Sequence, residues 1–189
     1  RMGKHDEIGP RRIETQGVAF RGWCTNEEIR ITANCLARNF EPTFALVQEI
    51  LLQPRWDVAE YDRLKKALET SLKGSEANAT AIANRNFYKL LYGSRHILSV
   101  PVNGTLSTAQ RITLDDLKTY YESFVAPEKA VFHVAGSIDQ SRVENTVRAL
   151  ENSWTPKTGY APIYESPDPV AGGRVYFINF PDAKQSVIY

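Results

Sequence analysis

The sequence predicts an α+β fold in which an antiparallel sheet is covered by helices. Three observations predict it. Apolar residues alternate on both sides of a polar turn in residues 17–36, apolar residues recur at helical spacing in five later stretches, and short apolar runs stand at 130–135 and 174–180. The order is therefore hairpin, helices, strand, helix, linker and strand, which is typical of the mixed α+β class.

The first element is the stretch "GVAFRGWCTNEEIRITANCLA", which we interpret as an antiparallel hairpin that turns at "TNEE". With the turn near Asn26, Cys24 pairs with about Ile29, and Cys35 lies far along the partner strand. Because this geometry disfavours a disulfide, we interpret both cysteines as small buried residues. Two cysteines of this kind do not define the redox compartment.

Two helices follow the hairpin. Residues 39–54 carry Phe40, Phe44, Val47 and Leu51 at helical spacing and end before a proline. Residues 56–74 form the second helix, which Asp57 caps and Gly74 stops. Its buried stripe is expected at five positions: Val58, Tyr61, Leu64, Leu68 and Leu72.

Three more helices are predicted further along, at residues 78–93, 113–125 and 139–154. The fourth helix of the chain begins with a capping box from Thr113 to Asp116, and Pro127 follows its end. The intervening residues 95–112 contain proline and glycine and are interpreted as a loop. The nearly continuous apolar run Ala130–Ala135 predicts a buried strand.

The last part of the chain predicts a domain boundary. Residues 155–173 are rich in proline and glycine and indicate a linker between a domain at 1–154 and the start of a following domain at 174–189. The chain ends inside the strand pattern "QSVIY" and starts with an arginine before its single methionine. We therefore expect a segment of a larger protein, with part of the sheet missing at its N-terminal side.

Twelve residues are expected to form the ordered core, because they come from the helical stripes and strand runs. They are Ile31, Phe44, Val47, Leu51, Leu64, Leu68, Ile82, Leu117, Val131, Val134, Val147 and Leu150.

The charge balance and the apolar runs of the sequence bear on which classes of partner are expected. The chain has 189 residues, 23 Lys and Arg against 22 Asp and Glu, and a net charge of +1. This balance provides no electrostatic reason to expect nucleic acid or an anionic membrane as a partner. The sequence has no apolar run that approaches the ~18 residues of a transmembrane helix.

The residues alone indicate no catalytic site. His5, His96 and His133 are scattered, and none stands four residues from another, so a helical metal pair is absent. We interpret Gly136 as a turn glycine rather than part of a phosphate loop, and Arg63–Lys66 as a solvated helix face. The glycosylation tripeptides at Asn78 and Asn103 are short patterns that arise often by chance.

The order of several motifs resembles a known family. The motifs are "LARNFEPTFALVQEILLQPRWDVAEYDRLKKALETSL", "LYG" followed by "NGT", "ITLDDLKTYYESFVAPEKA", "VAGSID" and "DAKQS", and together they cover residues 13–189. This set resembles the pitrilysin/insulinase family of zinc peptidases, which includes insulysin and the mitochondrial processing peptidase. The resemblance implies domains with an antiparallel sheet covered by helices, in two halves that close around a peptide.

The resemblance also implies where catalysis would reside. The active half of the family carries His-x-x-Glu-His on a helix and a more distant glutamate, in which the histidines and that glutamate bind zinc. The His-x-x-Glu-His motif is absent here, and the region that would carry it would precede residue 1. The third ligand would fall at or near Ser71, and Glu69 has the wrong offset. We therefore carry over no catalytic, metal or substrate-binding residue, and the chain resembles the non-catalytic half.

Two functional hypotheses follow from the resemblance. In the first, this is an internal, non-catalytic domain of a zinc metallopeptidase that helps to form the peptide chamber. It would have no cofactor of its own, zinc would belong to the parent protein, and its partners would be the missing domains of its chain and a peptide or unfolded polypeptide. In the second, it belongs to a zinc-free scaffold or core-subunit homologue. The sequence leaves the compartment open, a periplasmic or extracytoplasmic parent included.

Overall fold

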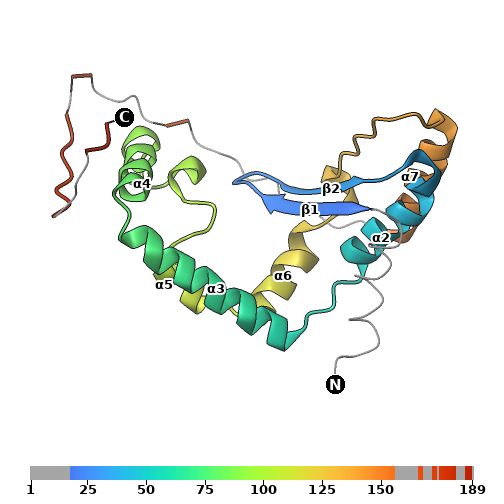
Figure 1. The fold of residues 1–189 in the computed structure, drawn as a ribbon, viewed down its shortest axis with the longest axis horizontal. Helices are drawn as coiled ribbons and strands as arrows, with labels where there is room; N and C mark the ends of the chain where they lie inside the picture. The colour runs from blue at the N-terminus through green and yellow to red at the C-terminus, as the bar shows by residue number, and fades with distance from the viewer. Residues whose placement is uncertain (1–17, 156–165, 168–171, 174, 182–185, 189) are drawn as a thin grey trace. The chain divides into compact units, whose positions relative to one another are not determined.

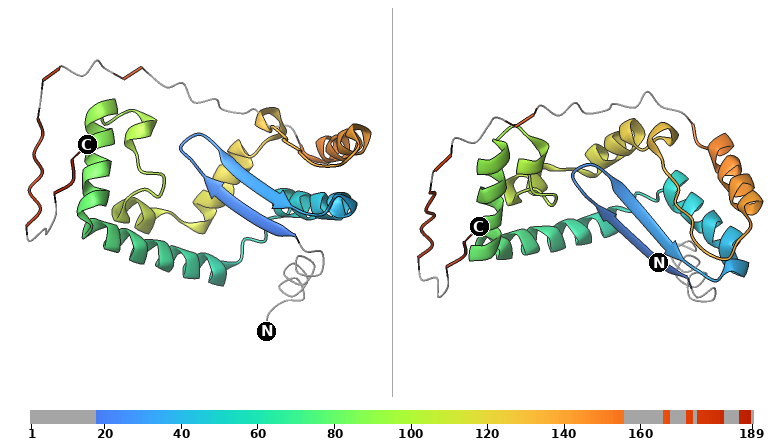
Figure 2. Two further views of the ribbon diagram at one scale, coloured as in Figure 1. Left: turned by 45° about the horizontal axis from the view of Figure 1, so that its top comes forward. Right: turned by 90° about the horizontal axis from the view of Figure 1, so that it is seen from above.

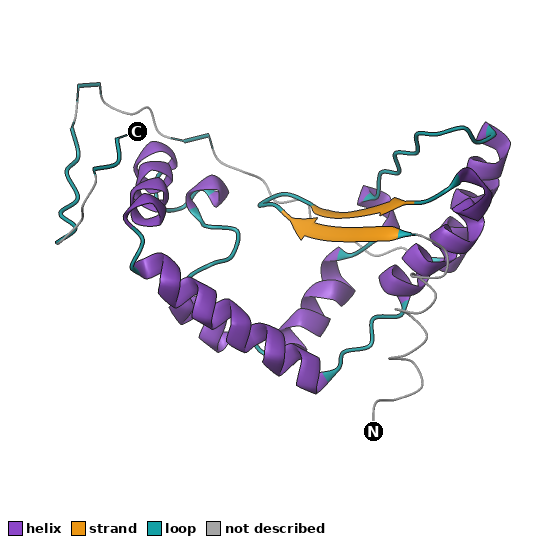
Figure 3. Ribbon diagram, in the orientation of Figure 1, coloured by secondary structure: helices purple, strands orange, loops and turns teal. Residues whose placement is uncertain are grey.

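The computed structural model describes residues 18–155, 166–167, 172–173, 175–181 and 186–188. These residues divide into two compact units, which are treated one at a time. The described residues within 1–24, 28–55 and 118–160 form the first unit, and those within 25–27, 56–117 and 161–189 form the second. Figure 1 labels the helices and strands, and Figure 3 shows that helices dominate over a small antiparallel sheet, as the sequence predicts.

The sheet of the first unit is a hairpin of β1 (Ala19–Cys24) and β2 (Ile29–Asn34). The strands are antiparallel, and their register runs from the pair of Cys24 and Ile29 at the turn to the pair of Ala19 and Asn34. The predicted hairpin and its register are confirmed. Both cysteines are free, as expected, but Cys24 is exposed rather than buried.

Helices pack on this hairpin and on each other in the first unit. η1 (Ala37–Asn39) leads into α2 (Phe40–Leu52), which contacts β2, and α7 (Gln140–Ser153) lies beside α2 in both Figure 1 and Figure 2. Phe44, Leu150 and Trp154 form the buried centre between these two helices. The partly buried residues around this centre are Phe40, Leu51, Leu52, Val125, Ala130 and Val147.

Polar bonds tie the same helices together. Arg142 on α7 donates from Nε and Nη2 to the two carboxylate oxygens of Glu41 on α2, at 2.8 and 2.7 Å. The Tyr121 hydroxyl donates to the carbonyl of Leu51 at 2.6 Å. Because this bond satisfies a carbonyl at the C-terminal end of α2, it also defines where that helix ends.

α6 (Leu114–Phe124) begins with the predicted capping box. The Asp116 amide donates to the Thr113 hydroxyl at 3.1 Å, and the Thr113 amide and hydroxyl donate to the Asp116 carboxylate at 2.8 and 2.7 Å. η3 (Pro127–Lys129) follows the helix, with Pro127 at its first position. The start and end signals that the sequence shows for this helix are therefore confirmed.

The second unit contains α3 (Val58–Glu76), α4 (Ala79–Tyr92), η2 (Ile97–Ser99) and α5 (Leu106–Arg111). α3 contacts α4 and α5, and α4 contacts η2. The Asp57 side chain caps α3 as predicted, by accepting from the amide of Glu60 at 2.7 Å. α4 ends at Gly93, whose φ of 77° is a conformation that glycine adopts readily.

Two boundaries in the second unit differ from the prediction. α3 does not stop at Gly74 but continues to Glu76, where the Ser75 hydroxyl donates to the carbonyls of Ser71 and Leu72 at 3.0 Å each. A glycine inside a helix costs only about 1 kcal/mol, so the helix can continue two residues past Gly74. The predicted loop at 95–112 contains η2 and α5, because Thr105 and Thr108 form a reciprocal cap at the start of α5.

The predicted strand Ala130–Ala135 is wrong. None of these residues belongs to a strand, and the exposed fractions of Val131 and Val134 are 74% and 42%. A strand exists only when a second backbone completes its hydrogen bonds, and no described residue does so here. Of the expected strand at 174–180, residues 175–180 are described and form no strand with the described residues. Most of the predicted linker at 155–173 lies outside the described residues.

The predicted core is confirmed for two residues, Phe44 and Leu150. Val47, Leu51, Leu68, Ile82 and Val147 are half-buried. The prediction is wrong for the exposed residues Ile31, Leu64, Leu117, Val131 and Val134. These side chains follow the right period, but within their own unit no layer of described residues covers them, and burial requires a covering layer as well as a period.

Candidate functional site

The residues nearest to the family's zinc-ligand position lie on α3. Ser71 is exposed, and its carbonyl accepts from Ser75, whereas Glu69 is half-buried. His96 accepts from the amide of Leu98 through Nδ1, and His133 is exposed in the segment after η3. Over the described part of the chain, no three His, Cys, Asp or Glu residues gather where they could hold a metal ion. The donors present there do not fit a zinc site.

Two residues of the basic face Arg63–Lys66, Arg63 and Lys65, have different roles. Arg63 donates to Glu60 at 2.6 and 2.8 Å on the helix surface, and this ion pair raises the pKa of Arg63. Lys65 instead donates to the carbonyls of Gln110 and Ile112 at 2.9 and 2.7 Å. It therefore holds the end of α5 against α3, and the interpretation of Lys65 as part of a solvated face is wrong.

Tyr61 also donates a hydrogen bond to the carbonyl of Ile112. Its hydroxyl donates to Ile112 at 2.6 Å, and the Lys65 ammonium lies 5.7 Å from the centre of its ring. Two donors on one turn of α3 thus meet the backbone just before α6. Sequence reasoning missed this contact, although the spacing of Tyr61 and Lys65 by four residues places both on one face of a helix.

Other short motifs have structural roles. The carbonyl of Gly136 accepts from the amide of Ile138 at 3.1 Å, in agreement with a turn glycine. Asn78 caps α4 through its side chain, which accepts from the amide of Ala81 at 2.9 Å. Asn103 lies in the turn in which the Gly104 amide donates to Pro101 at 2.8 Å. These contacts explain the residues without a ligand.

Three side chains have shifted pKa values with clear causes. Hydrogen bonds from Arg142 lower the pKa of Glu41, and hydrogen bonds from the Thr113 side chain and backbone lower that of Asp116. Burial raises the pKa of Tyr121. Each of these groups joins or caps helices, so the shifts indicate structural contacts rather than a catalytic acid or base.

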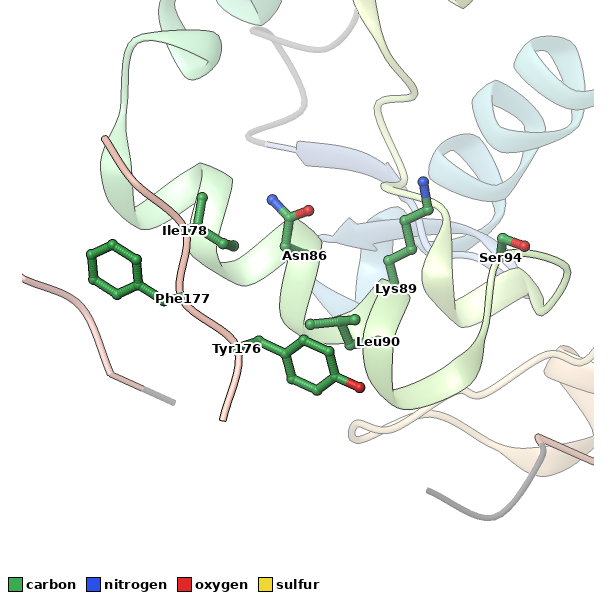
Figure 4. Close-up of a pocket in the computed structure, with 7 residues that line it drawn as sticks. All are labelled: Asn86, Lys89, Leu90, Ser94, Tyr176, Phe177 and Ile178. Carbon is green, nitrogen blue, oxygen red and sulfur yellow. The ribbon is translucent and has the colours of Figure 1, made fainter. Parts of the chain in front are cut away.

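A pocket of about 390 Å³ lies between α4 and the extended residues Tyr176–Ile178. Figure 4 shows the Leu90 side chain pointing toward the Tyr176 ring and the Phe177 ring pointing away from the helix. Asn86 and Lys89 project from neighbouring positions on α4, and Ser94 follows the helix. The pocket thus combines an apolar side with an amide, an ammonium and a hydroxyl group.

A second, more open pocket of about 550 Å³ lies at the junction of α3 and α4. It is lined by small and polar residues, namely Gly74, Ser75, Asn78, Thr80, Ala81 and Asn84. Ser75 and Asn78 already use their side chains in bonds to backbone groups of α3 and α4. The first pocket is therefore the better candidate for binding.

Sequence reasoning named none of the residues of the first pocket as a site. Asn86 and Tyr176 are far apart in the sequence, and no spacing rule joins a helix to an extended segment at that distance. The one available signal was the apolar run at 174–180, which was interpreted as a strand. The structure instead places its described part against α4.

Comparisons with known proteins give a consistent result. Residues 111–189 match the family described as the peptidase M16 inactive domain. A protein of Helicobacter pylori, named non-peptidase homolog YmxG, is 20% identical over 181 residues, which are 94% of this chain and 40% of that protein.

Two solved structures share the fold. The peptidase M16 inactive domain from Pseudomonas fluorescens matches with a TM-score of 0.78 and 21% identity over 88% of this chain and 40% of its own chain. A chain of Complex III2 from Candida albicans, with Inz-5 bound, matches with a TM-score of 0.62 and 17% identity over 84% of this chain and 39% of its own. The chain thus spans about 40% of the length of these relatives.

Among the described residues, no helix combines the length and the apolar character needed to cross a bilayer.

Proposed function

We propose that the chain is a non-catalytic domain of a zinc-dependent peptidase of the peptidase M16 family, which is the pitrilysin/insulinase family. In this role it forms part of the wall of a peptide-binding chamber. The observation that carries the proposal is the match of residues 111–189 to the inactive domain of the family. The partners are the other domains of its own protein and a peptide or unfolded polypeptide.

The chemistry of the described residues supports a role in binding rather than in bond cleavage. Their His, Cys, Asp and Glu side chains do not gather in a group that fits zinc. Zinc peptidases need three protein ligands and an activated water. In this proposal the metal therefore belongs to another domain, and no catalytic step passes through the residues described above.

A direct test uses the purified 189-residue chain and a fluorescein-labelled, reduced and carboxymethylated polypeptide. We expect the fluorescence anisotropy of the label to rise as the chain binds, with no cleavage of the polypeptide on a gel. A flat anisotropy curve would contradict the role in a peptide chamber. Cleavage that survives further purification would contradict the non-catalytic role.

Metal analysis tests the assignment of zinc to another domain. After dialysis we expect substoichiometric zinc in the purified chain, and we expect a His-x-x-Glu-His motif elsewhere in the full-length protein. One tightly held zinc ion per chain that is lost in His133→Ala would contradict the first expectation. A full-length protein without that motif would remove zinc dependence from the proposal.

A zinc-free scaffold is the second candidate function. Two of the relatives favour it, since one is named a non-peptidase homolog and another is a chain of Complex III2. Under this alternative, the full-length protein lacks the zinc motif and the domain serves in assembly. The sequence of the full-length protein and the binding test together distinguish the two candidates.

A further inference from the structure

The turn that precedes α5 contains a chemically reactive pair of residues. Asn103 is followed by Gly104, and this is the single Asn-Gly pair among the ten asparagines of the sequence. Asn103 is exposed, and its side chain forms no hydrogen bond with a described residue. Because glycine has no Cβ, no side chain shields the backbone nitrogen that follows the asparagine. The Asn103 side chain can therefore react with its own backbone.

We propose that Asn103 is a site of spontaneous deamidation to isoaspartate, and that the turn and the cap of α5 control the rate of this reaction. The deprotonated amide nitrogen of Gly104 attacks the carbonyl carbon of the Asn103 side chain, and a succinimide ring forms. The side-chain nitrogen takes up a proton and leaves as ammonia. Water then opens the ring at either carbonyl, which yields aspartate or isoaspartate. Ammonia is lost and water is gained, so the reaction needs no oxidant or other reactant.

The fold restrains the attacking nitrogen. The Gly104 amide donates to the carbonyl of Pro101 at 2.8 Å. Next to it, the Thr105 amide donates to the Thr108 hydroxyl at 2.8 Å, and that hydroxyl donates to the Thr105 carbonyl at 2.9 Å. The same hydroxyl lies close to Gly104, since a Cβ added there would be 2.8 Å from it. Attack therefore requires local opening of the turn, and the free energy of opening slows the reaction.

The product changes the entry into α5. Isoaspartate carries the main chain through its side-chain carbon, so the backbone before Gly104 gains a methylene and the residue gains a carboxylate. The longer backbone disrupts the bond from Gly104 to Pro101. The other end of α5 stays in place, because Tyr61 and Lys65 of α3 donate to the carbonyl of Ile112. The modification thus acts on the start of α5 and leaves its contact with α3 intact.

Peptide mapping by mass spectrometry tests the proposal on the full 189-residue chain. Trypsin cleavage after Arg95 and Arg111 releases residues 96–111, in which Asn103 is the only asparagine. During incubation of the folded chain at mildly alkaline pH, we expect this peptide to gain the mass difference between water and ammonia before any other asparagine-containing peptide. A sample digested without incubation corrects for conversion during digestion.

The identity of the product is a second readout. An isoaspartate-specific methyltransferase with a labelled methyl donor should label the incubated chain, and the label should lie in residues 96–111. The comparison within the same digest is Asn152, which precedes Ser153. No conversion at Asn103, or a conversion no faster than that at Asn152, would overturn the proposal.

Matched variants test the chemistry and the restraint separately. Asn103→Gln should abolish the early mass change, because the longer side chain would have to close a larger ring. Thr108→Val keeps the shape of the side chain but removes the hydroxyl that braces the turn. It should accelerate conversion about fivefold, the factor that corresponds to the loss of a typical helix cap. Thr70→Val removes a similar bond, from a hydroxyl to the Lys66 carbonyl of α3, and should leave the rate unchanged.

Unfolding in urea completes the test of the restraint. The unfolded chain should convert Asn103 faster than the folded chain and at least as fast as Thr108→Val. Equal rates in the folded and unfolded chains would overturn control by the turn, and this comparison does not depend on whether Thr108→Val folds. Acceleration in Thr70→Val as large as that in Thr108→Val would overturn it as well. Because no ligand is used, each of these results is independent of the proposed function.

Discussion

Removal of the Leu150 side chain should be the most damaging single change in the first unit. Leu150 is 1% exposed and is enclosed by the rings of Phe44 and Trp154 and by partly buried apolar residues. Leu→Ala substitutions at such sites lose the transfer free energy of the side chain and leave a cavity, for a typical total of 2–5 kcal/mol. Because large rings on two helices border the site and cannot collapse freely into it, we expect about 3 kcal/mol for Leu150→Ala.

The stability cost at Leu150 can be compared with the cost at two less buried leucines of α3. Leu64 is 53% exposed, so Leu64→Ala should change the free energy of unfolding by about 0.5 kcal/mol or less. Leu68 is half-buried, and Leu68→Ala should cost about 1 kcal/mol, since full burial of a leucine is worth about 1.5–3 kcal/mol. The structure thus ranks three leucines that look alike in the helical pattern of the sequence.

Urea titration measures this ranking, followed by fluorescence for Leu150→Ala in the first unit and by circular dichroism for Leu64→Ala and Leu68→Ala in the second unit. Trp154 is buried in the same cluster as Leu150 and reports on the first unit when Trp23 and Trp56 are replaced by phenylalanine. A shift of the midpoint without a change of slope shows a loss of stability alone. If Leu150→Ala costs less than about 1 kcal/mol, or no more than Leu64→Ala, the assignment of the core is refuted.

The remaining predictions concern caps, a turn and a charged pair. Asp57→Ala should destabilise the second unit by about 1 kcal/mol, because the cap of α3 is lost, and the loss is measured by circular dichroism in urea. Gly104→Ala should cost more than the usual ~1 kcal/mol, because φ is +69° and the added Cβ would lie 2.8 Å from the Thr108 hydroxyl; a variant as stable as wild type would contradict this account. Arg142 lowers the pKa of Glu41, so the stabilisation from this pair is present above the ordinary pKa of glutamate, about 4.3, and disappears as pH falls through the lowered value. Arg142→Gln should therefore reduce the drop in thermal midpoint between pH 7 and strongly acidic pH, and an unchanged drop would show that the pair does not contribute.

Helices could be predicted from the sequence because their signals are local. The side chain of Asp57 and the pair Thr113 and Asp116 act within three residues of the helix ends that they cap. The hairpin register could be predicted for the same reason, since the turn at "TNEE" determines which residues face each other. The start of α5 was missed because its capping box uses Thr108 in place of the usual Glu or Gln.

Strands and burial were predicted less well because they depend on distant partners. The run Ala130–Ala135 has the composition of a buried strand, yet a strand needs a second backbone that the run itself does not specify. The period of α3 likewise indicates which face is apolar but not how much of that face is covered. Leu72 is buried and Leu64 is exposed, although both belong to the same stripe.

The candidate site was beyond sequence reasoning for a related reason. Its apolar side comes from residues 176–178, and its ammonium and amide come from α4, in a part of the chain more than eighty residues earlier. Neither segment alone has a binding pattern. Only the placement of the extended segment along the helix brings Leu90 next to Tyr176.

The residues of the motifs that carry the family resemblance have structural roles in the fold. In "ITLDDLKTYYESFVAPEKA", Thr113 and Asp116 cap α6, Tyr121 binds the end of α2, and Pro127 begins η3. All of these side chains act on the backbone of this chain rather than on a ligand. Similarity in such residues therefore supports a shared fold but leaves the chemistry undefined. The function must be decided at positions outside these motifs.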